Sequence, residues 1–471
     1  MSTLIQLLAI IQTSLATLEQ VCSSSGTLVP DINEPFTPLS EAFRADPAAA
    51  KAAQTASAAA LHLAAILTPP QVSLYHIVGG HYRSTAARVC LESNVTEILR
   101  EAGPHGLHIK EIAAKNGQDP DKLGRFLRFL AVNHVYREVS PDVFANTRIS
   151  SMLDTLKPTV DLFASPEYKY DGTIGLAALA GHHLDETFKA SAIAWETLSD
   201  PKTSHSGDPT ASPFSRAVGK QETLWQFYAR PEEKYRQRRF DAGMQGIQAL
   251  QPADAILAAF DWKDLPPNSV IVDVGGGLGT SAFPLAREFP RLKVVIQDLP
   301  NVIADAKMLW AMKMPEAIKS GQVELQVHDF FEPQPQRDVS VFLLKQTIHD
   351  WSDEYCMKIL RRLREAASPE TKLIIVENIM RYACHDPSPS GESAIPGAAV
   401  AEAPEPLLAN FGAVNELEYL YDMTMFLMFN AQERTFHHFE RLLRESGWRL
   451  QMIRRNDVDS TFLPSIEAVP A

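Results

Sequence analysis

The sequence predicts an α/β domain with a parallel sheet in the C-terminal half of the chain, preceded by a helical region that contains a winged helix. From Ser269 onward, short apolar runs alternate with helical segments, which is typical of a parallel α/β sheet. Residues 85–150 instead show two helical patterns followed by a hairpin pattern, which together predict a winged helix. The length of 471 residues is enough for two or three domains.

The composition along the chain predicts four segments. We expect a helical extension over 1–84, a winged-helix domain over 85–160, a helical connecting region over 161–250 and the α/β domain over 251–471. Within the last segment, residues 384–410 are rich in Pro, Ala, Ser and Gly and hold few large apolar side chains. Such a stretch buries too little surface to order itself, so we predict a mobile insert there.

The N-terminal extension predicts two helices and no membrane segment. An amphipathic helix is expected over 1–20 rather than a signal peptide, because a basic start is missing. An alanine-rich helix over 47–67 should end before Pro69 and Pro70. No run approaches the ~20 apolar residues that cross a bilayer. The apolar residues of the first helix recur at spacings of three and four: Leu4, Leu7, Leu8, Ile11, Leu15 and Leu18.

Charge and cysteine usage exclude several classes of protein. The net charge of −13 argues against broad binding to nucleic acids or anionic membranes. Residues 91–150 carry eight Lys/Arg and eight Asp/Glu, so the winged helix is not basic and is expected to bind protein rather than DNA. The four cysteines are scattered without CxxC spacing, which fits a reducing compartment. We therefore predict a cytoplasmic protein with no nucleic-acid or membrane partner.

A glycine-rich turn after the first predicted strand indicates a cofactor site. Residues 270–280 read VIVDVGGGLGT, a buried strand that leads into a turn where the backbone can approach a ligand closely. Sheets that bind NAD open similarly, but they place glycine or alanine where this chain has Thr280. The shorter pattern suits a ligand without pyrophosphate, such as S-adenosylmethionine. Asp298 ends the next strand, where a carboxylate can accept hydrogen bonds from ribose hydroxyls.

Six motifs together resemble class II small-molecule O-methyltransferases, the plant caffeate type and its fungal relatives. In chain order they are DVGGGLG, DLPNVI, HDFFEP, LLKQTIHDWSDEYCMKILRRL, VEN and NAQERT. The resemblance covers about residues 85–455 and implies a Rossmann-like methyltransferase domain that uses S-adenosyl-L-methionine. It implies that His349 is the catalytic base, flanked by Glu377 and Glu433. The cofactor-binding residues that it implies are Gly275, Gly276, Gly277, Asp298, Asp329, Phe330 and Lys345.

The chemistry of these residues agrees with the resemblance. A methyl group on a sulfonium needs no further activation, so we expect no metal. A phenol has a pKa near ~10, and a histidine with a pKa near ~6.5 is a suitable general base at neutral pH. His349 follows the strand predicted over 341–344, and Glu377 ends the next strand, so both lie at the edge of the sheet where ligands bind. Taken alone, His349 could equally cap the helix that follows it.

Two segments rich in methionine and aromatic residues are candidates for the acceptor site. Methionine adapts to flat aromatic ligands, although ordinary helix core gives the same pattern. The resemblance places substrate-facing residues in both segments, and we expect a small aromatic, phenolic substrate. The candidates are Phe240, Met244, Asp422, Met425 and Phe426.

Three other functions remain open at this point. A catalytically silent homologue could act as a scaffold, although His349, Glu377 and Glu433 occur together. An NAD-dependent oxidoreductase is disfavoured by the short glycine pattern, and a metal-dependent catechol methyltransferase by the lack of an evident carboxylate cluster. In the resembling family the N-terminal region forms an intertwined homodimer. The resemblance therefore implies that 85–160 is a dimerisation domain and that the protein is a homodimer.

Overall fold

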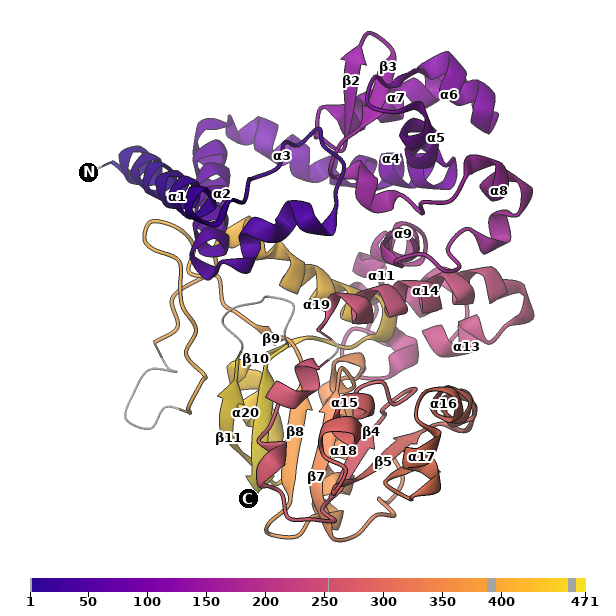
Figure 1. The fold of residues 1–471 in the computed structure, drawn as a ribbon, viewed down its shortest axis with the longest axis vertical. Helices are drawn as coiled ribbons and strands as arrows, with labels where there is room; N and C mark the ends of the chain where they lie inside the picture. The colour runs from indigo at the N-terminus through magenta and orange to yellow at the C-terminus, as the bar shows by residue number, and fades with distance from the viewer. Residues whose placement is uncertain (1, 253, 388–394, 456–462) are drawn as a thin grey trace.

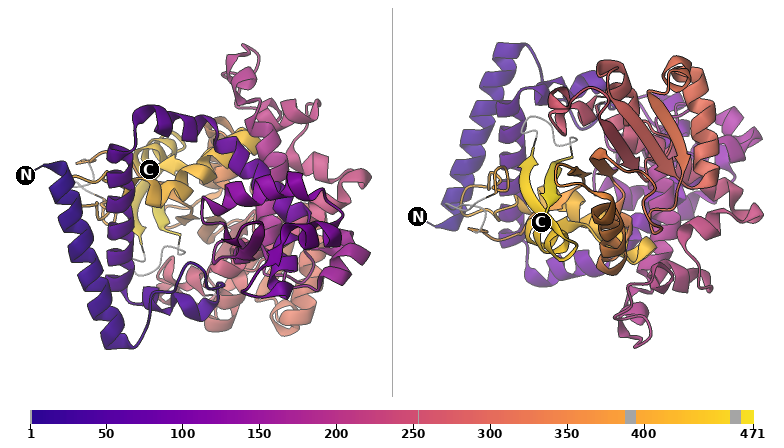
Figure 2. Two further views of the ribbon diagram at one scale, coloured as in Figure 1. Left: turned by 90° about the horizontal axis from the view of Figure 1, so that it is seen from above. Right: turned by 90° about the horizontal axis from the view of Figure 1, so that it is seen from below.

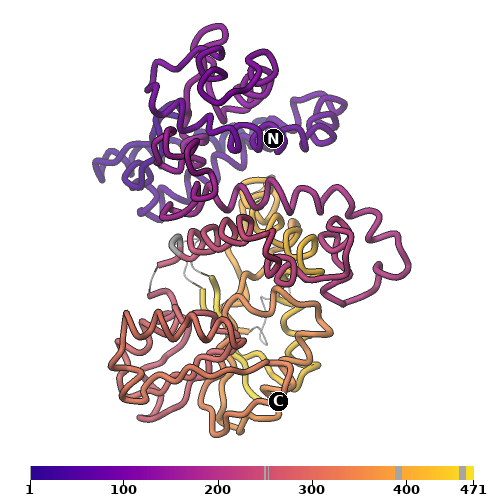
Figure 3. The backbone as a smooth tube through the Cα atoms, turned by 90° about the vertical axis from the view of Figure 1, so that its right-hand side faces the viewer, coloured from indigo at the N-terminus to yellow at the C-terminus, as the bar shows by residue number. Residues whose placement is uncertain are grey.

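The computed structural model describes residues 2–252, 254–387, 395–455 and 463–471. Its helical N-terminal part lies above the α/β domain in Figure 1, and the side view in Figure 3 shows the same two layers. Helices of the connecting region and one late helix, α19 (Glu416–Phe429), lie between them. The predicted fold class is confirmed in its main features.

A seven-stranded sheet forms the centre of the C-terminal domain. Its order is β11-β12-β8-β7-β4-β5-β6, and its first five strands in the chain pair in parallel. They are β4 (Val270–Val274), β5 (Lys293–Asp298), β6 (Val323–Val327), β7 (Val339–Lys345) and β8 (Lys372–Val376). The helices that connect and cover them are α15 (Ala282–Glu288), α16 (Pro300–Lys313), α17 (Pro315–Lys319), α18 (Asp353–Ala366) and α20 (Phe436–Glu445).

The sheet is mixed, which corrects the expectation of a purely parallel one. β12 (Ser465–Pro470) pairs antiparallel with both β8 and β11 (Trp448–Arg454). The apolar runs that predicted the other strands do not extend to this hairpin, because β11 alternates buried and partly exposed residues at the sheet edge. Two short strands, β9 (Ile379–Met380) and β10 (Arg434–Thr435), form a separate parallel pair.

The winged helix is present where the sequence predicts it. The two helices of its helix-turn-helix are α6 (Ile109–Asn116) and α7 (Pro120–Ala131), and Asp119 caps the second by accepting a hydrogen bond from the Lys122 amide. A small sheet of order β1-β3-β2 forms the wing. Its remaining elements are α4 (Gly80–Glu92), α5 (Val95–Ala102), β1 (Leu107–His108), β2 (Tyr136–Ser140) and β3 (Val143–Asn146).

Three α-helices precede the winged helix in the described residues: α1 (Thr3–Ser25), α2 (Pro47–Leu67) and α3 (Pro70–Val78). The two long ones lie side by side along one edge of the molecule in both views of Figure 2. Only part of the predicted apolar face of α1 is covered, since Leu7 and Leu18 are buried whereas Leu8 is 48% exposed. Helix α3 buries none of its residues. These helices therefore leave apolar surface uncovered in a single chain.

Helix α1 bears on the expectation that no segment crosses a membrane. By length and composition it is the one helix among the described residues that could cross a membrane. The search for an unbroken apolar run missed it because polar Gln, Thr and Ser side chains interrupt a stretch whose mean hydropathy is still 1.3. The predicted absence of a membrane partner stays a prediction.

The insert expected to be mobile is only partly described, since 388–394 lie outside the described residues. Its later part packs on the N-terminal helices. Leu407 is 8% exposed and clusters with Leu7 and Ala59. Leu407 stands in a stretch of mostly small and polar residues, so the composition of the segment gave no sign of this contact. The mobility of the insert stays a prediction.

The connecting region is helical and contains one π-helical turn, His183–Thr187. A single turn of this kind inside a helix often marks a functional site. It joins α9 (Leu176–His182) to α10 (Phe188–Ser191). The other helices of the region are α8 (Thr159–Ala164), α11 (Ala194–Ser199), α12 (Pro213–Val218), α13 (Leu224–Tyr228) and α14 (Lys234–Leu250).

Candidate active site

The carboxyl ends of four parallel strands meet at one edge of the sheet and carry most of the predicted site residues. β4 leads into the glycine turn, β5 ends at Asp298, β7 ends at Lys345 and Glu377 follows β8. This edge faces the helical part of the chain (Figure 1). Ligands of open α/β sheets bind in this position.

The turn after β4 has a backbone conformation that favours glycine. Gly275 and Gly277 have φ values of 66° and 59°, which favour glycine. A Cβ on Gly276 would lie 2.7 Å from the Asp273 carboxyl carbon, whereas a Cβ on Gly277 would meet nothing within 4 Å. The turn is therefore tight on its inner side and open at Gly277, where a ligand can approach the backbone.

Two acids support this turn. Asp298 Oδ2 accepts a hydrogen bond from the Gly277 amide at 2.8 Å, and Oδ1 accepts one from Leu299. Asp273 is 2% exposed, and its Oδ2 has no hydrogen-bond partner among the described residues. Burial raises the pKa of Asp273 to about 7, against the opposing effect of Lys345. A buried acceptor without a donor fits a ligand that carries an ammonium group.

The other predicted cofactor residues lie around the same turn. A Cβ on Gly275 would lie 3.3 Å from the Phe330 ring, so this ring borders the turn. Phe330 packs edge-on against Trp351, while Asp329 is exposed beside it. Lys345 donates to Gln346 Oε1 at 3.1 Å. An aromatic face next to an exposed acid suits a nucleobase, which stacks and donates hydrogen bonds.

His349 lies within a cluster of acids. Its Nδ1 donates to Glu433 Oε1 at 2.9 Å and lies 3.6 Å from Glu377 Oε2, while its Nε2 lies 3.6 Å from Asp350. The histidine side chain is 17% exposed, and Glu377 is fully buried. Since Nδ1 carries the hydrogen that Glu433 accepts, Nε2 is the atom that can take a proton from a substrate.

Glu377 also fixes the turn that carries the histidine. Its Oε1 accepts hydrogen bonds from the Thr347 amide at 2.8 Å and the Ile348 amide at 3.0 Å. Arg434, which is 1% exposed, donates to the carbonyls of Ile348 and Trp351. The sequence reasoning missed Arg434, although it stands next to Glu433 in the NAQERT motif. Both sides of the turn are thus held by buried charged groups.

The acids change the expected proton affinity of His349. Burial alone would lower its pKa, but the negative charges of Glu377 and Asp350 and the hydrogen bond to Glu433 raise the pKa to about 10. The value near ~6.5 assumed from the sequence is therefore corrected. The sequence indicated two flanking acids and missed Asp350, the neighbour in the chain.

The same cluster could hold a metal ion by geometry. One ligand atom each from His349, Glu377 and Glu433 lies within 4.8 Å of the others. The sequence reasoning found no such cluster, because its members come from three separate segments. The nitrogen and one carboxylate oxygen already share a hydrogen bond, which a metal would have to replace. The predicted independence from metals stays a prediction.

Three of the five acceptor-site candidates share one apolar cluster, and a fourth adjoins the histidine cluster. Phe240, Met244 and Phe426 belong to one apolar cluster between α14 and α19. Asp422 accepts a hydrogen bond from the Glu433 amide at 2.9 Å, so it adjoins the histidine cluster. Met425 is partly buried on the same helix but is not part of this apolar cluster.

The sequence reasoning missed several residues beside the Phe240 cluster. Trp225 and Tyr228 pack against the Phe240 ring, with centroids 5.7 and 5.1 Å away. The His182 ring meets Phe240 edge-on at 5.2 Å. No local pattern pointed to these residues, since the segment around His182 is rich in alanine and leucine and a second adjacent histidine pair occurs at 437 and 438.

Comparison with known proteins identifies relatives of both parts of the chain. The model of the O-methyltransferase domain matches residues 195–402, and that of the O-methyltransferase dimerisation domain matches 75–155. The chain is 52% identical to 4-O-methyltransferase 1 of Phanerochaete chrysosporium, over 100% of both chains. It is 30% identical to 3-O-methyltransferase 2 of the same fungus, over 94% of this chain and 92% of the other.

Solved structures share the fold. The mitomycin 7-O-methyltransferase MmcR superposes with a TM-score of 0.61 at 21% identity, covering 85% of this chain and 98% of that one. LepI in complex with S-adenosylmethionine gives a TM-score of 0.61 at 17% identity, covering 88% and 93% of the two chains.

Proposed function

Because the chain belongs to the family of S-adenosylmethionine-dependent O-methyltransferases, we propose that it methylates a phenolic hydroxyl of a small aromatic molecule with His349 as the general base. The observation that carries this proposal is the pairing of His349 Nδ1 with Glu433 at 2.9 Å, which leaves Nε2 for the substrate. The methyltransferase activity and the cofactor follow from the family. The phenolic acceptor and the base are the proposed steps.

The residues at the sheet edge fit the cofactor. Bound S-adenosylmethionine supplies a methyl group on a positively charged sulfur that a nucleophile can attack directly. We assign its binding to the backbone of Gly275–Gly277, to Asp298 for the ribose hydroxyls, and to Phe330 with Asp329 for the adenine. Lys345 lies near the turn, and its positive charge acts to lower the pKa of Asp273. The space beside Gly277 and the unpartnered Asp273 oxygen support this assignment.

The proton affinity of His349 matches that of a phenol. Its pKa of about 10 lies close to the ~10 of an ordinary phenol, so proton transfer from the phenol to Nε2 of the neutral imidazole costs little free energy, and this neutral form becomes more populated as the pH approaches 10. Glu433 and Glu377 stabilise the imidazolium that results. The oxygen then carries the negative charge needed for attack, and the proton remains on the histidine until it is released to solvent.

The acceptor is expected to lie against the aromatic cluster of α14 and α19. Phe240, Met244 and Phe426 supply an apolar wall, and Asp422 and Met425 lie on the same helix as Phe426. A flat aromatic molecule suits such a wall. The silent-scaffold alternative is disfavoured because the histidine and both acids are present and in contact.

The test is methyl transfer from labelled cofactor to a panel of phenols, with mass analysis of the product. We expect label on a phenolic oxygen and one S-adenosylhomocysteine released per methyl group. Aliphatic alcohols and anilines of similar size serve as controls. Transfer to these controls but to no phenol would overturn the phenolic assignment, while leaving the methyltransferase family intact.

The uncovered N-terminal helices support a homodimer. Helix α3 exposes Tyr75 and Ile77 at 76% and 77%, and the matched dimerisation domain begins at residue 75. Obligate dimers bury more than ~2,000 Å² and often lack a stable monomer. Light scattering at micromolar concentration should give twice the chain mass. A fully active monomer would contradict this proposal.

A further inference from the structure

Three consecutive carbonyl groups between α11 and α12 accept hydrogen bonds from the two segments that carry the proposed catalytic pair. They belong to Ser206, Gly207 and Asp208, which we call the strap. The Asn430 side-chain amide donates to the first and the third carbonyl, at 2.8 and 2.9 Å. The Ser352 hydroxyl donates to the middle one at 2.8 Å. One short stretch of the connecting region therefore holds two segments that are far from it in the chain.

Both donors stand three positions from a member of the catalytic pair. Ser352 follows His349, and Asn430 precedes Glu433. The proposed mechanism requires His349 Nδ1 to donate to Glu433 Oε1, which lies 2.9 Å away. The two bonds to the strap therefore act next to the two groups whose separation the mechanism requires.

The local structure shows that both side chains are used for the strap. Ser352 occupies the N-cap position of α18, where a serine hydroxyl commonly accepts a hydrogen bond from the helix, yet it makes no such bond among the described residues. Asn430 ends α19 with a φ of 55° and donates to the strap. A Cβ on Gly207 would lie 2.7 Å from Ser352 Oγ, so the close approach of the strap depends on glycine.

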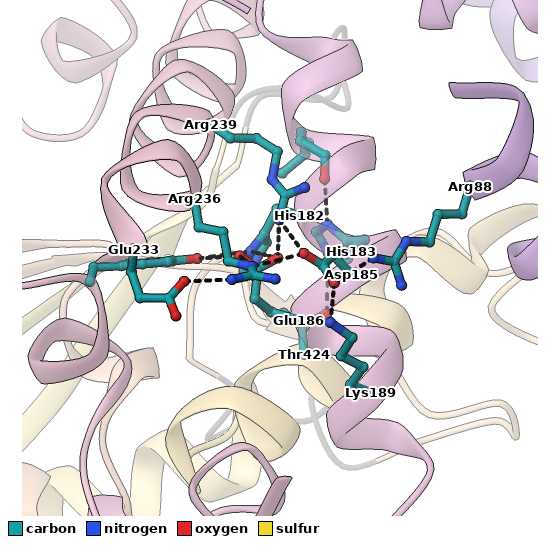
Figure 4. Close-up of polar contacts among 12 residues, drawn as sticks. Arg88, His182, His183, Asp185, Glu186, Lys189, Glu233, Arg236, Arg239 and Thr424 are labelled. Carbon is teal, nitrogen blue, oxygen red and sulfur yellow. Dashed lines mark hydrogen bonds and ion pairs between the residues drawn. The ribbon is translucent and has the colours of Figure 1, made fainter. Parts of the chain in front are cut away.

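The helical region that precedes the strap is held by a buried ion network, as Figure 4 shows. Asp185, in the π-helical turn, is surrounded by four cations: Arg88 at 2.8 Å, Arg236 and Arg239 at 2.9 Å each, and Lys189 at 2.6 Å. Burial alone would raise the pKa of Asp185, but the hydrogen bonds from Lys189, Arg239 and Arg236 hold it well below its usual range. The network ties this turn to α4 and α14.

On its other side the strap leads into the proposed acceptor wall. Asp208 caps the short helix Pro209–Ala211 by accepting a hydrogen bond from the Thr210 amide, and α12 follows. Phe214 of α12 is 1% exposed and belongs to the same apolar cluster as Phe240. The strap is therefore anchored at both ends, and a group held in this way can position others precisely.

We propose that the strap is a positioning element, which sets the separation of His349 and Glu433 by holding the segment that follows the base and the segment that precedes the acid. The inference rests on the proposed role of His349 as the general base. Arg434 already joins the same two segments within the α/β domain, through the Ile348 carbonyl. The strap adds a second tie from the helical side, and Ser352 and Asn430 are then positioning residues.

The test removes each tie without disturbing the helix end that carries it. Ser352→Ala deletes a hydroxyl that does not cap α18. Asn430→Gly deletes the amide and keeps a residue that favours positive φ. The matched control is Asn268→Gly, since Asn268 is an exposed asparagine with a φ of 65° just before β4, at the opposite end of that strand from the glycine turn. S-adenosylhomocysteine affinity, measured by calorimetry, checks that each variant is folded. Asn430→Asp, which cannot donate, replaces Asn430→Gly if the glycine variant does not fold.

Two phenols distinguish a displaced base from a general disturbance. On a phenol of pKa near ~10, each variant should lower kcat about 10-fold and leave the KM for the cofactor unchanged, because a misplaced catalytic group loses up to ~10²-fold in rate. A nitrophenol, assayed at a pH where it is already ionised, needs no proton removal, so kcat on it should stay within about threefold of the wild type. The double variant should lose about as much on the first phenol as the more damaging single variant, since both changes release the same strap. The control should keep wild-type rates on both phenols.

The outcomes separate this inference from the proposed function, because His349→Gln is measured in the same assays. If His349→Gln keeps full activity on the weakly acidic phenol, the proposed base is wrong and the inference falls with it. If His349→Gln loses activity while the strap variants keep it, or lose it equally on both phenols, the role of the strap alone is overturned. Losses that multiply in the double variant also overturn it, and this comparison decides if the nitrophenol is not an acceptor.

Discussion

The two sides of the active site are built in different ways. The sheet side is built around a glycine turn, two acids that follow strands and the peptide groups that these acids bind. The helical side uses side chains, with an aromatic cluster between α14 and α19 and a buried ion network behind it. We assign the first side to the cofactor that the family shares and the second to the methyl acceptor.

This difference explains how much the sequence could predict. Backbone sites need glycines and acids at fixed spacing, so Gly275–Gly277, Asp298 and Glu377 were found from their motifs and lie at the sheet edge as expected. The helical side depends on contacts between residues far apart in the chain. Asp185 meets Arg88 across 97 positions, and no local pattern reports such a contact.

Electrostatics were the least predictable property of the site. The sequence placed His349 beside two glutamates but gave it an ordinary pKa. Three negative groups within 3.6 Å of its ring change that value, and their distances follow only from the fold. The antiparallel β11–β12 hairpin escaped prediction for a related reason, since its pattern is too weak without its neighbours.

The largest effect on activity is expected from replacing the proposed base on the sheet side, His349. His349→Gln should lower kcat by ~10²–10⁴-fold while S-adenosylhomocysteine binds with unchanged affinity, because the variant removes the proton acceptor from the sheet edge and leaves the glycine turn. Steady-state kinetics and calorimetry measure the two quantities. A variant with near wild-type kcat on a phenol of pKa near ~10 would contradict the assignment.

A second change tests whether the ion network stabilises the helical side. Asp185→Asn removes the acid that faces four cations and should destabilise the protein by about 3–5 kcal/mol, as for other broken buried charge pairs. Thermal unfolding measures the loss. Asp171→Asn is the matched control, because Asp171 pairs with Arg238 at the surface and such pairs contribute ~0–1 kcal/mol. Equal losses of stability in the two variants would show that the buried network stabilises the protein no more than a surface ion pair does.

The sheet side can be weakened without touching the base. Asp298→Ala should weaken S-adenosylmethionine binding by ~1–3 kcal/mol, or roughly 5–150-fold, since it removes a charged acceptor and releases the Gly277 amide. Calorimetry gives the dissociation constant directly. The exposed Glu288→Ala variant is a control, and an unchanged constant for Asp298→Ala would remove this residue from the site.

The pH dependence of kcat/KM tests whether Glu433 raises the pKa of His349. Below pH 10 the wild-type His349 is mainly protonated, so kcat/KM on a phenol of pKa near ~10 should rise with pH up to about 10. Glu433→Gln removes a negative charge and a hydrogen-bond acceptor, which lowers the histidine pKa. The break in the profile should therefore move down by about 1–3 pH units. The wild type and the variant are measured with the same phenol, so the ionisation of the substrate contributes equally to both profiles. Identical profiles would argue against the His349–Glu433 pair.

The smallest effect is expected from chelation. The cluster of His349, Glu377 and Glu433 could hold a divalent metal by distance alone, yet the proposed chemistry assigns all three to proton transfer. If that is right, EDTA leaves kcat/KM unchanged, and added zinc inhibits because it competes with the proton on the histidine. A metal that activated the acceptor would give the opposite pattern: activity lost with EDTA and restored by magnesium.

The His349→Gln variant sharpens this choice, because it should lose the inhibition by zinc together with the base. Activity that depends on a metal would mean that His349, Glu377 and Glu433 bind an ion rather than move a proton, and the proposed general base would fall with it.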